Sequence, residues 1–129
     1  LKKNRTIMLL NSFFEISNLQ ANGPDITATL TINREHEIFI GHFPGQPVVP
    51  GVCMMQMIKE IMEHVTGKKM NLVKAHDMKF LAVIDPSVNN CINAVLKFSQ
   101  DEKGIVSVTA TLTKDETLHF KFKGQFDFL

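Results

Sequence analysis

The sequence predicts an α+β fold in which an antiparallel β-sheet wraps around one long central helix. Only residues 51–66 carry apolar side chains in a helical pattern, whereas the segments before and after them are rich in β-branched and aromatic residues. Short polar connections between those segments favour antiparallel hairpins. The chain has 129 residues, of which 44% are hydrophobic, and a chain of this size buries roughly two-thirds of its unfolded surface. We therefore expect a single domain over residues 1–129.

The predicted strands fall into two groups, one on each side of the helix. Residues 10–20 end at the turn-forming sequence Ala-Asn-Gly-Pro-Asp, and residues 25–32 then alternate apolar and polar side chains, which predicts a hairpin. Beyond the helix, polar and turn-prone separators divide the chain into further β-rich runs. These runs span residues 71–85, 91–99, 104–113 and 117–128.

The helix is predicted to be enclosed, because apolar residues cover most of its circumference. Gly67 stands where a helix stop belongs. A solvated face is the simpler interpretation of Gln56, and core filling is the simpler interpretation of the methionines; the alternative for both is a substrate cavity. The polar residues form one stripe at spacings of three and four, the only side that we expect to meet water or a polar cavity: Gln56, Lys59, Glu60 and Glu63.

The composition excludes several classes of function. Lys plus Arg number 14 and Asp plus Glu number 13, so the net charge of +1 lacks the basic excess of a general nucleic-acid binder. Cys53 and Cys91 lack any metal-ligand spacing, and we interpret them as reduced core thiols of a cytoplasmic protein without a metal or cofactor. No segment approaches the roughly 18 consecutive apolar residues of a membrane span, and residues 1–10 lack the apolar core of a signal peptide.

The residues before the helix predict a preorganised loop. Pro44, Pro47 and Pro50 fix the backbone at three places, and Pro50 is well placed at a helix entry. The amides of Gly51 and Val52 would then be among the unpaired N–H groups of the helix start, where the helix dipole favours a negatively polarised oxygen. Because Gly51 has no Cβ, a ligand carbonyl can approach the backbone closely. This arrangement predicts an oxyanion site.

His42 is the side chain in this loop that titrates near neutrality. A single loop histidine is usually structural. Its combination with the proline-rich loop and the glycine at the helix start favours a catalytic role here.

Two stretches, His42-Phe43-Pro44-Gly45 and Pro47-Val48-Val49-Pro50-Gly51-Val52, resemble the active-site motif of the FabZ-type β-hydroxyacyl-[acyl carrier protein] dehydratases. Residues 78–86 are also similar to a later strand end of that family, although the family's arginine and first proline are absent. The resemblance implies the hotdog fold, an antiparallel sheet wrapped around one central helix. The element order predicted above is similar to that fold over nearly the whole chain.

The resemblance also implies roles for individual residues. His42 corresponds to the catalytic histidine, and Gly51 to the glycine whose amide polarises the thioester carbonyl. The family's second catalytic residue is a helix carboxylate, fourteen positions after the histidine, which reaches the active site across the dimer interface. In this chain Gln56 occupies that position. Substrate contacts are implied for the other motif residues: Phe43, Pro44, Val49, Pro50 and Val52.

Gln56 leaves three functions open. Its amide cannot deliver a proton as a carboxylic acid can, but it can hydrogen-bond a β-hydroxyl, so the first is a dehydratase, or the reverse hydratase, acting with His42. The second is an acyl-binding or structural subunit of a dehydratase heterodimer whose partner supplies the carboxylate. The third is a hotdog thioesterase. The complete His-Phe-Pro loop favours the first two. Glu60 lies one turn further on, about 5.4 Å along the helix, which is a large displacement for a positioned acid.

The family implies an acyl carrier protein as partner, a pathway of fatty-acid or polyene-type synthesis, and a homodimer, a heterodimer or a higher oligomer. Acyl carrier proteins are acidic, so basic surface residues are the candidates for contact. These are Arg34, Lys68, Lys69, Lys74, Lys121 and Lys123.

Overall fold

The computed structural model describes residues 8–41 and 47–129 and contains one six-stranded sheet and two helices. The strands are β1 (Phe14–Asn22), β2 (Asp25–Ile32), β3 (Met70–Phe80), β4 (Cys91–Gln100), β5 (Val106–Lys114) and β6 (Thr117–Phe128). The helices are α1 (Ile38–Gly41) and α2 (Gly51–Thr66). The strand order is β1-β2-β4-β5-β6-β3, and every neighbouring pair is antiparallel. The predicted α+β architecture is confirmed.

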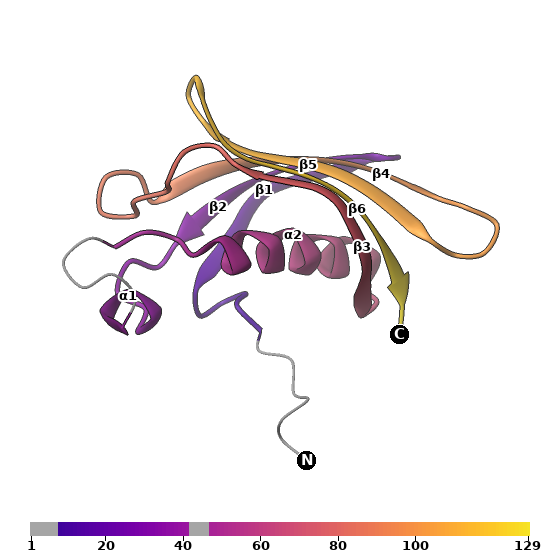
Figure 1. Ribbon diagram of the computed structural model, residues 1–129, viewed down its shortest axis with the longest axis horizontal. Helices are drawn as coiled ribbons and strands as arrows, with labels where there is room; N and C mark the ends of the chain where they lie inside the picture. Colours follow the sequence, from indigo (N-terminus) through magenta and orange to yellow (C-terminus); the bar gives the residue numbers. More distant parts are fainter. Residues whose placement is uncertain (1–7, 42–46) are drawn as a thin grey trace, which may run out of the picture.

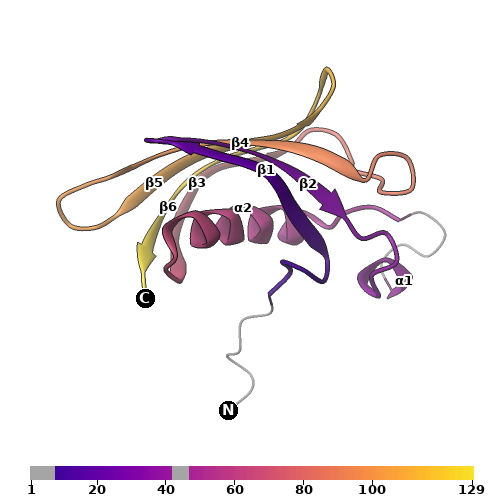
Figure 2. The same cartoon turned by 180° about the vertical axis from the view of Figure 1, so that it is seen from behind.

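One face of the sheet covers α2, as the two opposite views in Figure 1 and Figure 2 show. In β6 the buried Phe120 and Phe122 alternate with the exposed Lys121 and Lys123, so the phenylalanines face the helix and the lysines face outward. Full burial of such a side chain stabilises the fold by about 1.5–3 kcal/mol. The helix contributes its own buried apolar side chains to this core: Cys53, Met54, Met57, Ile58, Ile61 and Met62.

The bounds of α2 agree with the sequence prediction. Pro50 precedes the helix in an extended conformation, with φ −62° and ψ 147°. Gly67 follows it in the left-handed region at φ 73°, where its amide donates to the carbonyl of Glu63. A residue with a Cβ adopts that conformation at a cost, so the glycine ends the helix at this point.

Strand ends are where the structure differs from the prediction. Strand β1 begins at Phe14 because residues 11–13 form a turn, with Asn11 at φ 73°. Strand β3 ends at Phe80, five residues before the predicted end, because the amides of Leu81 and Ala82 both donate to the carbonyl of His119. The short helix α1 was not predicted.

Strand β3 lies at the edge of the sheet, with β6 as its sheet neighbour. Most of its residues are exposed. Several of them are large and apolar: Leu72, Val73, Met78 and Phe80 are between 41% and 53% exposed. An edge strand presents unpaired backbone N–H and C=O groups, and apolar side chains beside them favour pairing with another chain.

No helix within residues 8–41 and 47–129 is long and apolar enough to cross a membrane. Cys53 and Cys91 are both free thiols, as predicted. Cys53 is buried, whereas Cys91 is only half-buried, so the prediction of a core thiol fits Cys53 better.

The two thiols are expected to react at different rates with an alkylating reagent. Burial raises the pKa of the Cys53 thiol, which lowers its fraction of reactive thiolate. We therefore expect Cys91 to be labelled first at pH 8, with Cys53 reacting only as the pH rises further. The folded state holds the Cys53 proton to higher pH than the unfolded state does. Protonated Cys53 therefore favours the folded state. This contribution to stability is fully present below the pKa that the thiol has in the unfolded chain, and it is lost as the pH rises through the pKa of the thiol in the folded protein. Mass spectrometry of Cys53→Ala and Cys91→Ala assigns each label, and faster labelling of Cys53 would contradict the prediction.

Candidate active site

The predicted site residues His42, Phe43 and Pro44 lie outside the described residues, so their roles stay predictions. The structure does describe the end of the loop and the start of α2. Val49 is buried, Pro50 is half-buried and Val52 is 76% exposed.

A groove of about 500 Å³ opens at the N-terminal end of α2. One wall consists of residues 48–51 together with Met54, and the other consists of Phe80, the last residue of β3, and residues 81–83. The side chains along it are apolar. Val49, Pro50 and Gly51, three of the predicted site residues, therefore lie together in one groove, whereas Val52 is not part of its lining.

Backbone hydrogen bonds hold the two walls in place. The amide of Val49, in the first wall, donates to the carbonyl of Ile84 at 2.9 Å. Ile84 directly follows the second wall, so this hydrogen bond joins the two walls. The amides of Leu81 and Ala82 donate to the carbonyl of His119 at 2.9 and 3.3 Å. The groove is thus attached to β6 at the core of the sheet.

His119 binds the same wall a second time through its ring. Its Nδ1 lies 3.1 Å from the carbonyl oxygen of Ala82, which can only accept, so Nδ1 carries the proton. His119 is 7% exposed. The position of His119 could not be predicted from the sequence, because it depends on the register shift between Leu112 and Thr113 of β5, which leaves His119 without a partner on that strand. No sequence signal marks that bulge.

The helix start has the features predicted for an oxyanion site. Within residues 8–41 and 47–129, the first amides of α2 that find an acceptor are those of Cys53 and Met54, both on the carbonyl of Pro50 at 3.0 and 3.2 Å. The amides of Gly51 and Val52 precede them and have no acceptor in that part of the chain. Since Gly51 lines the groove, a carbonyl oxygen bound there can meet the positive end of the helix dipole.

Gly51 is also required for space. A Cβ at this position would lie 2.8 Å from Cε1 and 2.9 Å from Cζ of Phe80, too close for carbon atoms. The ring of Phe80 stacks on Phe120 with a centroid distance of 5.1 Å, so moving it aside costs part of that contact.

Replacing Gly51 with alanine is therefore expected to lower the free energy of unfolding by about 1–3 kcal/mol through overpacking. Urea unfolding measures the loss. In the Phe80→Ala background the same change has no ring to displace, so adding Gly51→Ala there is expected to cost less than about 1 kcal/mol. Equal losses in both backgrounds would show that the Phe80 contact is not the cause.

Gln56 and Glu60 form a hydrogen-bonded pair on α2. Gln56 Nε2 donates to Glu60 Oε2 at 2.8 Å. The amide of Leu9 donates to the same oxygen at 2.8 Å, and the amide of Leu10 donates to Oε1 at 2.7 Å. Glu60 is 1% exposed, so its carboxylate is buried. Its two oxygens accept hydrogen bonds from three N–H donors.

Glu63 plays a similar part three residues further along α2. It is 7% exposed, and its Oε2 accepts the amide of Met70 at 2.9 Å while lying 3.6 Å from Nζ of Lys59. Of the two predicted surroundings of the polar stripe, water or a polar cavity, open water does not apply to Glu60 and Glu63, which are buried and line a pocket with residues 67–69. The chain before β1 and the start of β3 both reach this side of the helix, and their backbone amides need buried acceptors.

Within residues 8–41 and 47–129, no group of three or more His, Cys, Asp or Glu side chains could hold a metal ion. The described part of the candidate site consists of the apolar groove and the amides at the start of α2, and Gln56 is not among the residues that line that groove.

Comparison with known proteins decides the family. The family model of the ApeI dehydratase, described as ApeI-like, matches residues 18–126, which is most of the chain. The chain belongs to the ApeI-like dehydratase family. This result confirms the resemblance to dehydratases that the His-Phe-Pro motif indicated.

Individual relatives of this ApeI-like chain agree with that assignment. Over 98 residues it is 28% identical to the 3-hydroxyacyl-[acyl-carrier-protein] dehydratase FabZ of Oenococcus oeni, an alignment that covers 70% of each chain. Among solved structures, it is similar to the dehydratase heterocomplex ApeI:P of Xenorhabdus doucetiae, with a TM-score of 0.64 and 18% identity over 87% of this chain and 96% of that one. It is also similar to Cj0977, a sigma28-regulated virulence protein of Campylobacter jejuni, with a TM-score of 0.69 and 11% identity over 92% and 85% of the two chains. The predicted hotdog fold is confirmed, and the chain is a dehydratase-like hotdog protein.

Proposed function

We propose that this protein dehydrates β-hydroxyacyl groups carried as thioesters on an acyl carrier protein. The observation that carries the proposal is the apolar groove of about 500 Å³, which is lined by Gly51, whose amide has no acceptor within residues 8–41 and 47–129. A groove of this kind suits an acyl chain, and the amides suit the thioester oxygen. The FabZ relative supports the choice of a carrier-protein thioester.

The proposed reaction moves one proton through His42. The imidazole removes a proton from the α-carbon while the Gly51 amide stabilises the enolate-like thioester oxygen. The electron pair then forms the Cα=Cβ double bond, and the Cβ–O bond breaks. The departing hydroxyl takes the proton back from His42 and leaves as water. Gln56 holds the β-hydroxyl by a hydrogen bond during these steps.

A single-turnover assay with a β-hydroxyacyl carrier thioester tests this function. We expect a 2-enoyl thioester and water as products, detected by the absorbance of the conjugated double bond and by the mass of the carrier protein. Release of the free carrier thiol with no enoyl product would instead favour the thioesterase. Absence of both products, alone and with a partner subunit, would overturn the enzymatic assignment.

A second candidate is a subunit of a dehydratase heterodimer. The exposed apolar side chains on the edge strand β3 and the amide of Gln56 in place of a carboxylate both favour it. The similarity to a dehydratase heterocomplex lends further support.

In either case we propose that two hotdog subunits join through the free edge of β3, because this edge combines unpaired backbone groups with exposed apolar side chains.

Placing a charge on this edge is expected to separate the subunits. Val73→Glu puts a carboxylate on β3, where Val73 is 51% exposed, and should shift the species seen by light scattering from dimer to monomer at micromolar concentration. Val95→Glu is the matched control, since Val95 is 48% exposed on the interior strand β4. A wild-type protein of single-chain mass, or a Val73→Glu variant that stays dimeric, would contradict the proposed interface.

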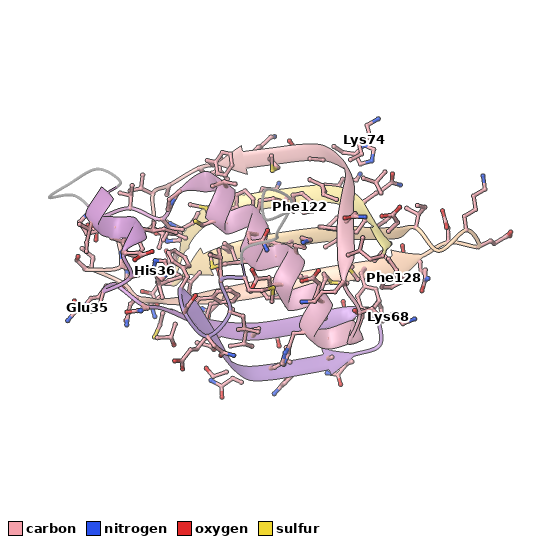
Figure 3. All side chains as sticks on the ribbon, turned by 90° about the horizontal axis from the view of Figure 1, so that it is seen from below. Glu35, His36, Lys68, Lys74, Phe122 and Phe128 are labelled. Carbon is pink, nitrogen blue, oxygen red and sulfur yellow. The ribbon has the colours of Figure 1, made fainter. Side chains whose placement is uncertain are left out.

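The proposed carrier protein is acidic and would contact basic residues. Lys121 and Lys123 are exposed on the outer face of β6. Lys68 lies over the ring of Phe128, with its Nζ 4.9 Å from the ring centroid. Figure 3 shows Lys68 and Phe128 near the end of α2.

The two free thiols suit a reducing compartment, so we propose that the protein is cytoplasmic.

A further inference from the structure

We propose that His119 is a positioning residue that fixes the second wall of the groove, Phe80 and residues 81–83, against the acyl chain of the substrate. This inference rests on the proposed function, which places an acyl chain in the groove. His119 is not among the residues that line the groove, so it would act on the substrate through the wall.

Three hydrogen bonds join His119 to this wall. Its backbone carbonyl accepts the amides of Leu81 and Ala82 at 2.9 and 3.3 Å, and its Nδ1 donates to the carbonyl of Ala82 at 3.1 Å. Ala82 is thus held through both its N–H and its C=O group. Strand β3 ends at Phe80, so these bonds continue the attachment to β6 at the point where the regular strand pairing stops.

A bulge in the sheet brings the ring of His119 to the wall. In the pairing of β5 with β6, Leu112 faces Phe120 and Thr113 faces Leu118, so His119 is an extra residue on β6. His119 and Phe120 are consecutive and both buried, which breaks the alternation of buried and exposed residues in that strand. Bulges redirect side chains in this way. The contact with Ala82 therefore depends on the bulge.

The second ring nitrogen of His119 shows that the ring is a poor choice for stability alone. With the proton on Nδ1, Nε2 is left as an acceptor, and in the part of the chain that the structure describes it is buried without a hydrogen-bond partner. An unsatisfied buried acceptor destabilises a fold, and an apolar side chain of similar size would avoid this cost. What a histidine provides at this position, and a leucine would not, is the hydrogen bond to Ala82.

A fixed wall is expected to act on substrate binding. The wall presents apolar side chains to the groove, since Phe80, Leu81 and Val83 all line it and are 53%, 52% and 68% exposed. Such side chains suit the alkyl part of an acyl group, which does not change during dehydration, so they would bind the ground state and the transition state equally. Loss of contacts of this kind raises KM and leaves kcat unchanged.

Steady-state kinetics with a β-hydroxydecanoyl carrier thioester test this role. His119→Leu removes the donor and keeps an apolar side chain, so we expect KM to rise by about fivefold or more with kcat within about twofold of the wild type. His119→Asn places an amide N–H near the position of Nδ1 and should bring KM back to within about twofold of the wild type.

A merely structural role of His119 predicts a different result. Loss of folded protein lowers the amount of active enzyme, so the apparent kcat would fall and KM would not change, and this outcome in His119→Leu would overturn the proposal. His64→Leu is the matched control, because His64 is exposed in the last turn of α2, away from the groove. It should change neither parameter.

Amide hydrogen exchange tests the hold on the wall independently of activity. In His119→Leu, the amides of Leu81 and Ala82 should exchange at least about tenfold faster than in the wild type. The amide of Gly67, which donates to Glu63 at the C-terminal end of α2, should not change, and His119→Asn should restore slow exchange at residues 81 and 82. Unchanged exchange at residues 81 and 82 in His119→Leu, or equal acceleration at all three amides, would overturn the proposal.

A measurement on the wild type keeps the test independent of how the variants fold. Nitrogen-15 NMR of the imidazole should show the His119 tautomer with its proton on Nδ1, and a proton on Nε2 alone would overturn the proposal. Selective release of residues 81 and 82 in His119→Leu, together with no dehydration by the wild type, would show instead that the proposed function is wrong while the hold on the wall exists.

Discussion

Alanine at position 42 is expected to abolish dehydration while leaving the melting temperature nearly unchanged. His42 is proposed to move the only proton of the reaction, and general acid–base catalysis by a positioned side chain is typically worth about a hundredfold to ten-thousandfold in rate. The enoyl-forming step in a single-turnover assay should therefore slow by at least about a hundredfold. Thermal unfolding followed by circular dichroism measures the second part of the prediction.

His64→Ala serves as the control for this experiment. His64 is exposed in the last turn of α2, away from the groove at the other end of the helix. Its removal should leave the rate of dehydration within about twofold of the wild type. A large loss of stability in His42→Ala would support a structural histidine instead.

Gln56→Glu is expected to make the enzyme faster and the fold less stable. The new carboxylate would lie at hydrogen-bond distance from Glu60, where Gln56 Nε2 now donates at 2.8 Å. A like charge so close raises the pKa of the new carboxyl group and keeps it protonated near neutrality, as a proton donor requires. We expect dehydration to accelerate by at least about tenfold, measured with the isolated protein and with any partner subunit. A fully active wild type that slows on substitution would show that the amide is already the working group.

The stability of Gln56→Glu should depend on pH. The folded pKa of the new carboxyl group is raised above its unfolded value, so the variant is most stable below the unfolded pKa and loses stability as the pH rises through the folded pKa. Ionisation of the new carboxyl group removes its hydrogen bond to Glu60, which costs about 1–3 kcal/mol. Urea unfolding at pH 5 and pH 8 should therefore show a larger deficit against the wild type at pH 8. Identical deficits at both pH values would show that the two carboxyl groups do not interact.

Much of the fold follows from sequence because its signals are local. Alternation predicted β2, β-rich runs between polar separators predicted the later strands, and Pro50 and Gly67 marked the ends of α2. The end of β3 could not be predicted, because it depends on amides of residues 81 and 82 that bond to a carbonyl far away in the sequence. Tertiary hydrogen bonds of this kind leave no periodic pattern.

The site divides in the same way. A motif of consecutive residues pointed to Val49, Pro50 and Gly51, which the structure brings together in one groove. The second wall of that groove, residues 80–83, and its attachment to His119 come from a distant strand and a bulge. Helical periodicity placed Glu60 on a polar stripe correctly, but it could not show that residues 9 and 10 return to cover it.

The strand order also sets when the helix can be covered during synthesis. Strand β3 follows α2 directly in the chain, yet its neighbour in the sheet is β6, so that Met70 pairs with Phe128. Pairing of strands so far apart in sequence is slow, and chains waiting for it expose apolar surface. A nascent chain that ends before residue 117 has the methionine-rich helix but no strand to place beside β3. Such chains are expected to depend on chaperones and to aggregate when released early, because the sheet around the helix cannot be completed before β6 has been synthesised.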